Sequence, residues 1–175
     1  ASSFENATLA PFNAFNGIFT DFWATSNEQY SDTTGLSIGV DIFEDGVTGS
    51  WLKIEMSSIR TIEKFQLMRR SFDSAPINWR ILTSTDDITY NVSMIQSTDY
   101  VYTTDIGLYS TDIFLPNPAF AKYIVFQITK VGASSQASLF EINFDGYNFK
   151  GPIQSSEPIN RQDVATKNYV DYIPN

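Results

Sequence analysis

Hydrophobic and polar residues alternate with a period of two in several stretches of the chain. The clearest case is residues 119–146, where a polar Gly/Ser turn separates two alternating runs. The apolar positions of the two runs are Ile124, Phe126 and Ile128, and then Phe140, Ile142 and Phe144. In the second run Glu141 falls on the opposite, polar side. Alternation of this kind is typical of half-buried strands, so the pattern predicts a β-hairpin with one apolar face.

Similar alternation predicts further strands upstream, over residues 51–56, 62–68 and 77–81. The side chains expected on their buried faces include Leu52, Ile54, Met56, Ile77, Trp79 and Ile81. A tight turn over residues 84–91 leads into a strand through Val92 and Met94. Residues 1–50 lack sustained alternation and are expected to be rich in loops, and the polar, tyrosine-rich residues 96–110 are expected to form an exposed loop. Short strands without a convincing amphipathic helix predict an all-β sandwich or jelly roll.

The composition changes after Tyr147, where Pro, Gly and Ser become frequent. This change predicts a β-sandwich over residues 1–148 and a linker and tail over residues 149–175. Asp163 can cap a short helix that extends to Tyr172, because its carboxylate can accept a free backbone N–H of the first turn. The tail is therefore expected to be short and either helical or extended.

Charge and residue usage exclude several classes of function. The chain has 11 Lys and Arg against 20 Asp and Glu, a net charge of −9, which disfavours nucleic acid and anionic membranes as partners. The absence of His and Cys argues against a structural zinc site or a Cys/His nucleophile. The lack of cysteine also favours assembly in a reducing cytoplasm. No apolar run approaches the roughly 20 residues that span a bilayer, and the start has no visible signal peptide.

Five stretches, in order, resemble the discoidin-type domain, which is the factor V/VIII C-type or galactose-binding-like jelly roll. They are AFNGIFTDFW, GSWLKIEM, INWRILTSTDDITYN, LPNPAFAKYIVFQIT and ASLFEINFDGY. The resemblance covers about residues 5–147 and implies a jelly-roll β-sandwich with ligand loops at one end. In the turn at residues 84–90 this sequence has Asp87 and Tyr90 where the family has Gly and Trp.

The segment 158–171, PINRQDVATKNYVD, resembles a short motif of phage and large-virus fibre proteins, usually found near trimeric stalks. This resemblance implies a homotrimeric parent protein at a virion surface or outside the cell, assembled in the host cytoplasm. The alternative is a solvated C-terminal helix without such a role.

The discoidin resemblance also implies a structural calcium ion, held by an early loop and a Glu of the last strand. The corresponding side chains are Asn16, Asp21 and Glu141, together with the carbonyl groups of Phe15 and Ile18. Calcium takes 6–8 oxygen ligands, which these groups could supply in part. Asn16 stands where the family usually has Asp. The alternative is that Asn16 and Glu141 hydrogen-bond only to the backbone of the loop.

Aromatic and polar side chains in the loops predict a carbohydrate site, since sugars offer an apolar C–H face and many hydroxyl groups. The family's sugar-binding modules often present an Arg at the position of residues 69–70; their usual His is absent here. The candidate sugar-binding residues are Asn27, Tyr30, Arg69, Arg70, Phe72, Tyr100, Tyr102 and Tyr109. For each tyrosine alone, packing on the end of the sandwich is the alternative.

Catalysis is not expected. The adjacent carboxylates Asp86–Asp87 and Glu44–Asp45 point apart, whereas a glycosidase needs two that face each other across roughly 5–10 Å. The leading hypothesis is a non-enzymatic module of a viral or phage-like fibre that recognises a host-surface glycan. A structural assembly domain without a glycan site is the second hypothesis. Lipid binding, as in the coagulation-factor domains, is a third, and the net charge opposes it.

Overall fold

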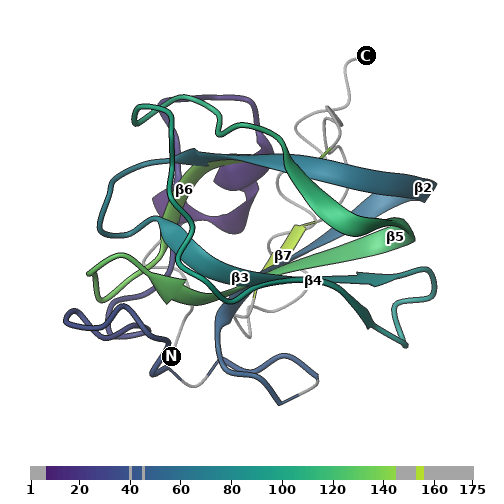
Figure 1. Ribbon diagram of the computed structural model, residues 1–175, viewed down its shortest axis with the longest axis horizontal. Helices are drawn as coiled ribbons and strands as arrows, with labels where there is room; N and C mark the ends of the chain where they lie inside the picture. Colours follow the sequence, from purple (N-terminus) through teal and green to yellow (C-terminus); the bar gives the residue numbers. More distant parts are fainter. Residues whose placement is uncertain (1–6, 40, 45, 145–152, 156–175) are drawn as a thin grey trace.

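The protein is an antiparallel β-sandwich with two short 3-10 helices near its N-terminus (Figure 1). The computed structural model describes residues 7–39, 41–44, 46–144 and 153–155. The helices are η1 (Ala7–Leu9) and η2 (Pro11–Phe15). The strands are β1 (Trp23–Ala24), β2 (Ser50–Arg69), β3 (Pro76–Ser84), β4 (Asn91–Gln96), β5 (Ile113–Val131), β6 (Ser138–Phe144) and β7 (Ile153–Ser155). The expected all-β architecture is confirmed.

The strands form one sheet in the order β1-β6-β2-β5-β3-β4, and β7 pairs with β2 outside this path. The first part of β2 pairs with β5, from Ser50 opposite Ile128 to Glu55 opposite Tyr123. Its last part pairs with β6, from Phe65 opposite Phe144. Register shifts interrupt β2 between these parts, and the sheet folds there into two facing layers (Figure 1). The expected runs 51–56 and 62–68 are thus one long strand.

The core lies between the layers and is rich in aromatic rings. Phe65 of β2 contacts Trp79, Phe126 and Phe144, with centroid distances of 6.1, 6.2 and 5.3 Å. All four rings are fully buried. Most of the predicted inward positions are buried as well: Leu52, Ile54, Met56, Trp79, Ile81, Ile124, Phe126, Ile128, Ile142 and Phe144. Burial of each such side chain stabilises the fold by about 1.5–3 kcal/mol relative to exposure.

The predicted hairpin over residues 119–146 is wrong, although both of its strands exist. β5 pairs with β2 and β3, and β6 pairs with β1 and β2, so the two strands lie on different sides of β2. Phe140 is half-buried because β6 has a register shift between the pairs at Met68 and Arg69. A bulge of this kind changes which side chains face inward, and Leu139 joins the core in place of Phe140.

Chain beyond the predicted domain boundary returns to the sandwich. β7 pairs with β2, with Ile153 opposite Ile54 and Ser155 opposite Leu52. The boundary at residue 148 and the expected helix over residues 163–172 lie outside the described residues. Within the described part of the chain, no helix has the length and apolar character needed to cross a membrane.

Candidate functional site

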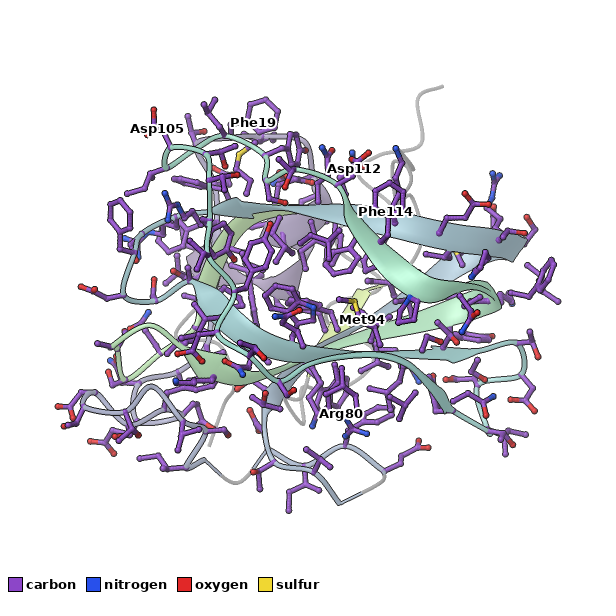
Figure 2. The ribbon with its side chains drawn as sticks, viewed as in Figure 1. Phe19, Arg80, Met94, Asp105, Asp112 and Phe114 are labelled. Atoms are coloured by element: carbon purple, nitrogen blue, oxygen red, sulfur yellow. The ribbon has the colours of Figure 1, made fainter. Side chains whose placement is uncertain are left out.

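Several loops gather at the end of the sandwich where β2 terminates (Figure 1). Backbone hydrogen bonds join them: Gly107 donates to the Arg69 carbonyl, and Ala133 donates to the Asp73 carbonyl. Figure 2 shows Phe19 and Asp105 at this end of the molecule. The loops that follow β2, β4 and β5 therefore form one surface together with the N-terminal segment.

A shallow open pocket of about 400 Å³ lies in this surface. Small-ligand sites have volumes of about 300–1,000 Å³, so its size suits a small ligand. Polar groups dominate its lining. The β2–β3 loop contributes Arg70, Ser71, Asp73 and Ser74, the β5–β6 loop contributes Ser134 and Gln136, and the N-terminal segment contributes Leu9 and Phe22.

Arg70 is held in the pocket by an aromatic ring. Its guanidinium carbon lies 3.8 Å from the centroid of Phe22, which in turn packs edge-on against Phe140. By contrast, Arg69 donates to the Thr104 carbonyl and Arg80 donates to Gln127. Among the described residues, no group accepts a hydrogen bond from Arg70, so its planar set of N–H donors is available to a ligand.

Asp73 supplies the opposite charge in the same pocket. Its side chain is exposed and has no hydrogen-bond donor or ion-pair partner among the described residues. A free carboxylate can accept two hydroxyl hydrogens at once, while a guanidinium donates in a planar fork. The pocket therefore combines donors and acceptors that could serve an uncharged polyhydroxyl ligand.

Serine side chains fix the shape of the β2–β3 loop. The Ser74 backbone N–H donates to Ser71 Oγ at 3.1 Å, and the two hydroxyl groups also share a hydrogen bond. Ser74 Oγ shares a further hydrogen bond with Ser138 Oγ of β6, and the Ser138 N–H donates to the Ser74 carbonyl at 2.9 Å. The pocket wall is thus attached to the sheet. This attachment reduces the entropy cost of ordering the loop when a ligand binds.

Arg69 points to the other side of β2 from Arg70, as neighbours on a strand do. Its guanidinium lies between the rings of Phe72 and Tyr102, at 4.3 and 4.9 Å from their centroids. Its Nη2 donates to the Thr104 carbonyl at 2.6 Å, and the residue is only 7% exposed. The two arginines that the sequence placed in one site therefore belong to separate environments.

The loop after β4 is anchored to the core rather than simply exposed. The ring of Tyr100 packs against Trp79 at 5.1 Å and against Tyr102 at 4.9 Å between centroids. Tyr102 donates its hydroxyl hydrogen to the Pro76 carbonyl at 2.9 Å, and burial raises its pKa. These tyrosines close the end of the core, which is the packing alternative that their sequence left open.

Tyr30 is buried, whereas the sequence predicted it in an exposed ligand loop. It is 1% exposed, its hydroxyl donates to the Ile128 carbonyl at 3.0 Å, and it accepts a hydrogen bond from the Ser50 N–H at 3.3 Å. Asn27 is exposed and lies outside the pocket lining. Tyr109 is half-buried and packs edge-on against Phe19, with 6.2 Å between centroids.

Of the predicted sugar-binding residues, only Arg70 lines the pocket; Phe72 is 64% exposed and lies in sequence between the lining residues Ser71 and Asp73. Sequence reasoning missed Phe22, although it belongs to the stretch AFNGIFTDFW that carried the family resemblance. It also missed Asp73, whose position three residues after Arg70 in a loop was the available signal.

The loop predicted to hold calcium does meet the last strand of the sandwich. The Gly17 N–H donates to Glu141 Oε2 at 3.2 Å. Within the loop, Asn16 Nδ2 donates to Asp21 Oδ2 at 3.3 Å, and Asn16 Oδ1 accepts from the Ile18 N–H at 2.7 Å. The Asp21 N–H donates to the Ile18 carbonyl at 3.0 Å. The described residues contain no cluster of three or more acidic or other strong metal-ligating side chains.

Glu141 is 5% exposed, and desolvation raises its pKa to about 7, opposed in part by the hydrogen bond from Gly17. The chemistry of the oxygen set, with two carboxylates, an amide and backbone carbonyls, fits a weak calcium site. Among the described residues, no cationic side chain pairs with this carboxylate.

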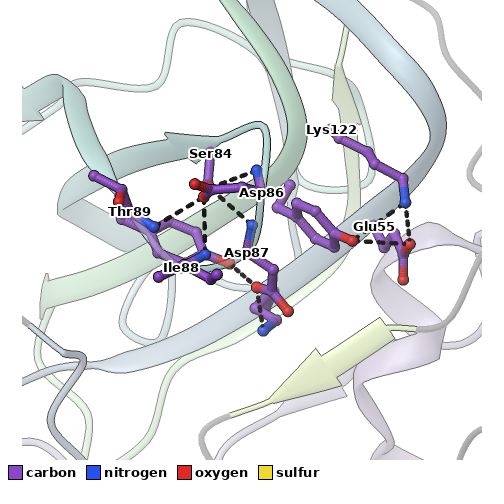
Figure 3. Close-up of polar contacts among 10 residues, drawn as sticks. Glu55, Ser84, Asp86, Asp87, Ile88, Thr89 and Lys122 are labelled. Atoms are coloured by element: carbon purple, nitrogen blue, oxygen red, sulfur yellow. Dashed lines mark hydrogen bonds and ion pairs between the residues drawn. The ribbon is translucent and has the colours of Figure 1, made fainter.

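The carboxylates considered for catalysis shape a turn and a salt bridge (Figure 3). Asp86 Oδ1 accepts from the Thr89 and Ile88 backbone N–H groups, both at 2.9 Å, and these bonds lower its pKa. Asp87 pairs with Lys53 at 2.6 Å and accepts a hydrogen bond from the Tyr90 hydroxyl. Both carboxylates are thus occupied in holding the turn, and Asp45 lies outside the described residues.

No protein-family model and no curated protein sequence matches the chain. Among solved structures it is similar to a carbohydrate-binding module, CBM32-3, of a family 31 glycoside hydrolase from Clostridium perfringens. The TM-score is 0.61 at 15% identity, over 84% of this chain and 88% of that one.

Two further structures are similar to the chain. One is a family 32 module from C. perfringens NanJ in complex with galactose, with a TM-score of 0.57 and 13% identity over 82% of this chain and 90% of that one. The other is chitosan-binding module 2 of a Paenibacillus sp. IK-5 chitosanase/glucanase, in complex with chitotriose, with a TM-score of 0.54 and 20% identity over 82% and 92%. The chain has the discoidin-like β-sandwich fold of these modules.

Proposed function

We propose that the chain is a non-catalytic carbohydrate-binding domain whose ligand occupies the pocket at Arg70. The observation that carries this proposal is that one pocket contains both the Arg70 guanidinium, stacked on Phe22, and the Asp73 carboxylate, neither of which has a hydrogen-bond partner for its side chain among the described residues. Sugar hydroxyl groups both donate and accept, so they satisfy both charged groups at once. The fold shared with carbohydrate-binding modules supports this assignment.

The test is a glycan array followed by calorimetry with the best ligand. Arg70→Ala should weaken binding at least about tenfold, because hydrogen bonds to charged groups contribute about 1.5–3 kcal/mol. Asp73→Asn should weaken it by a smaller factor. Phe120→Ala is the control, since Phe120 is 70% exposed on β5, opposite Thr61, away from the β2–β3 loop. Unchanged affinity in both pocket variants, or no glycan bound by the wild type, would overturn the proposal.

We further propose that the domain belongs to a viral or phage-like fibre or surface protein and recognises a host-cell glycan outside the cell. The support is the fibre-type motif of residues 158–171, which lies outside the described residues. A homotrimer would multiply a weak single-site affinity, because later contacts become intramolecular. Light scattering of the full chain and of a chain ending at Ser155 tests this. Loss of a trimer on truncation would support the tail as the trimerising element. An unchanged oligomeric mass would show that the tail does not cause trimerisation.

We also propose a structural calcium ion at Asn16, Asp21 and Glu141, with the carbonyls of Phe15 and Ile18. Its role would be to hold the N-terminal loop against β6 near the ligand surface. Calcium should raise the melting temperature of the wild type and leave that of Glu141→Gln nearly unchanged, while magnesium should have little effect on either. An equal rise in both proteins would place any calcium elsewhere.

A structural assembly role is the alternative. It is favoured by two exposed aromatic side chains on β5, Phe114 at 64% and Phe120 at 70% exposure. Exposed apolar patches of this kind often mark protein interfaces. If the wild type binds no glycan, and Phe114→Ser with Phe120→Ser abolishes incorporation into the parent particle, this alternative holds.

A further inference from the structure

Phe72 occupies an unusual place beside the pocket. It lies between Ser71 and Asp73, both of which line the pocket, but its own side chain is directed to the Arg69 side of the loop. Its ring is 64% exposed, although one face lies over the Arg69 guanidinium at 4.3 Å. The exposed surface is therefore mainly the opposite face and the edge of the ring.

The support beneath this ring is built from buried groups. Arg69 is 7% exposed, is stacked between Phe72 and Tyr102, and donates to the Thr104 carbonyl at 2.6 Å. Tyr102 is fixed in turn by its hydrogen bond to the Pro76 carbonyl. A cation beneath an aromatic ring is attracted to the ring, which orders the phenyl group before any ligand arrives.

The backbone of Phe72 is fixed as well. Gly132 approaches it so closely that an added Cβ would lie 2.6 Å from the Phe72 carbonyl oxygen. The adjacent Asp73 carbonyl accepts a hydrogen bond from Ala133 at 2.9 Å. The β5–β6 loop thus holds the ring at a set position relative to the pocket. An ordered aromatic face open to solvent is the arrangement that stacks on the C–H face of a sugar ring.

We infer that Phe72 forms a second sugar subsite, so that the domain binds a glycan of at least two residues. This inference rests on the proposed function of the pocket. One sugar residue occupies the pocket at Arg70 and Asp73, and the adjoining residue stacks on Phe72. Phe72 and Asp73 are consecutive, with Cα atoms about 3.8 Å apart, but the Phe72 ring lies on the Arg69 side of the loop, so the bound glycan would cross the loop from the pocket to the ring. The second residue presents a flat apolar face, since a phenyl ring offers it no hydrogen bond.

The experiment compares the monosaccharide and the di- or trisaccharide of the best array ligand by calorimetry. Phe72→Ala should leave the monosaccharide affinity within about twofold and weaken the oligosaccharide about three- to tenfold, as expected for a lost aromatic contact. Phe72→Tyr should retain the oligosaccharide affinity of the wild type. Phe19→Ala is the matched control, because Phe19 is a 55% exposed aromatic side chain of the N-terminal loop that packs on Tyr109 rather than on Arg69.

The outcomes separate the subsite from the pocket. If Phe72→Ala leaves oligosaccharide affinity unchanged, or weakens both ligands equally, the subsite is overturned. Arg70→Ala should weaken both ligands; if it weakens neither, the proposed pocket fails instead. Oligosaccharide binding without measurable monosaccharide binding supports the subsite, provided that Phe72→Ala reduces it. Thermal unfolding of each variant confirms that the fold is retained.

Discussion

The Arg70 guanidinium lies over the ring of Phe22 with 3.8 Å between the guanidinium carbon and the ring centroid. The two residues come from distant parts of the chain, the end of β2 and the N-terminal segment before β1. Among the residues that the structure describes, no group accepts a hydrogen bond from this guanidinium. The N-terminal segment therefore contributes to the ligand surface by orienting a side chain that it does not itself carry.

Replacing Phe22 tests this orienting role. Phe22→Ala removes the ring under Arg70, and we expect glycan affinity to fall about three- to tenfold, since cation–π contacts contribute about 0.5–2 kcal/mol. Phe22→Trp should retain the affinity, and Phe12→Ala in the same segment is the control. Calorimetry measures the effect. Equal losses for Phe22→Ala and Phe12→Ala would indicate general loosening of the segment rather than lost stacking.

Tyr30 should matter for stability and not for ligand binding. Tyr30→Phe removes a hydroxyl that donates to the Ile128 carbonyl and accepts from the Ser50 N–H. Because these buried groups lose their partner, we expect the unfolding free energy to fall by about 1–3 kcal/mol. Tyr109→Phe is the control, since its half-buried hydroxyl has no hydrogen-bond partner among the described residues. Urea denaturation measures stability, and a selective loss of glycan affinity in Tyr30→Phe would contradict the buried placement.

Gly35 is expected to be intolerant of substitution. It has φ +68°, and an added Cβ would lie 2.0 Å from the Val131 carbonyl oxygen. Gly107 has a similar φ of +78°, but an added Cβ there meets no atom within 4 Å. Gly107→Ala should cost about 1–2 kcal/mol from backbone strain alone. Gly35→Ala should cost clearly more in the same denaturation experiment, because the β5 backbone must move. Equal losses of unfolding free energy for Gly35→Ala and Gly107→Ala would show that the β5 backbone accommodates the added Cβ without cost.

The buried carboxyl of Glu141 predicts a pH dependence of stability. Its pKa is raised from 4.5 to about 7, so the folded state binds a proton more tightly than the unfolded state. Its stabilising contribution is therefore present below pH 4.5 and is lost as the pH rises to about 7. The expected decrease in unfolding free energy, measured in the presence of a chelator, is on the order of 3 kcal/mol.

Glu141→Gln should abolish this decline, because glutamine has the same shape as the protonated acid and no charge to desolvate. The exposed Glu44→Gln is the control and should behave as the wild type. Denaturation curves between pH 4 and 8 provide the measurement. If the stability of Glu141→Gln declines by the same amount between pH 4 and 8, other groups cause the pH dependence.

The sequence predicted the buried faces of individual strands well, and their pairing poorly. Alternation identified Leu52, Ile54 and Met56 because one face of β2 packs on the core. It carried no information about the neighbour of each strand, so adjacent runs were joined into a hairpin that the structure lacks. The sequence placed Phe140 on the buried face for a local reason. A one-residue bulge shifts the following side chains to the other face and leaves no sign in an alternating pattern.

The candidate site was predicted in part. The period-two rule already implies that Arg69 and Arg70 point apart, so their separation was foreseeable. The burial of Tyr30 was not, because it lies in a segment without periodicity and is packed by residues distant in sequence. Phe22 becomes a neighbour of Arg70 only through the long-range fold, whereas Asp73 lies three residues after Arg70 in the same loop and could have been predicted.

The pairing of β7 with β2 has a mechanical consequence. Ile153 and Ser155 lie opposite Ile54 and Leu52, so the chain after the sandwich is joined to the middle of the molecule by a short antiparallel ladder. Tension applied beyond Ser155 acts on this ladder before it reaches β6 or the packed core. The three-residue strand can yield first and extend under force while the loops at the end of β2 keep their shape.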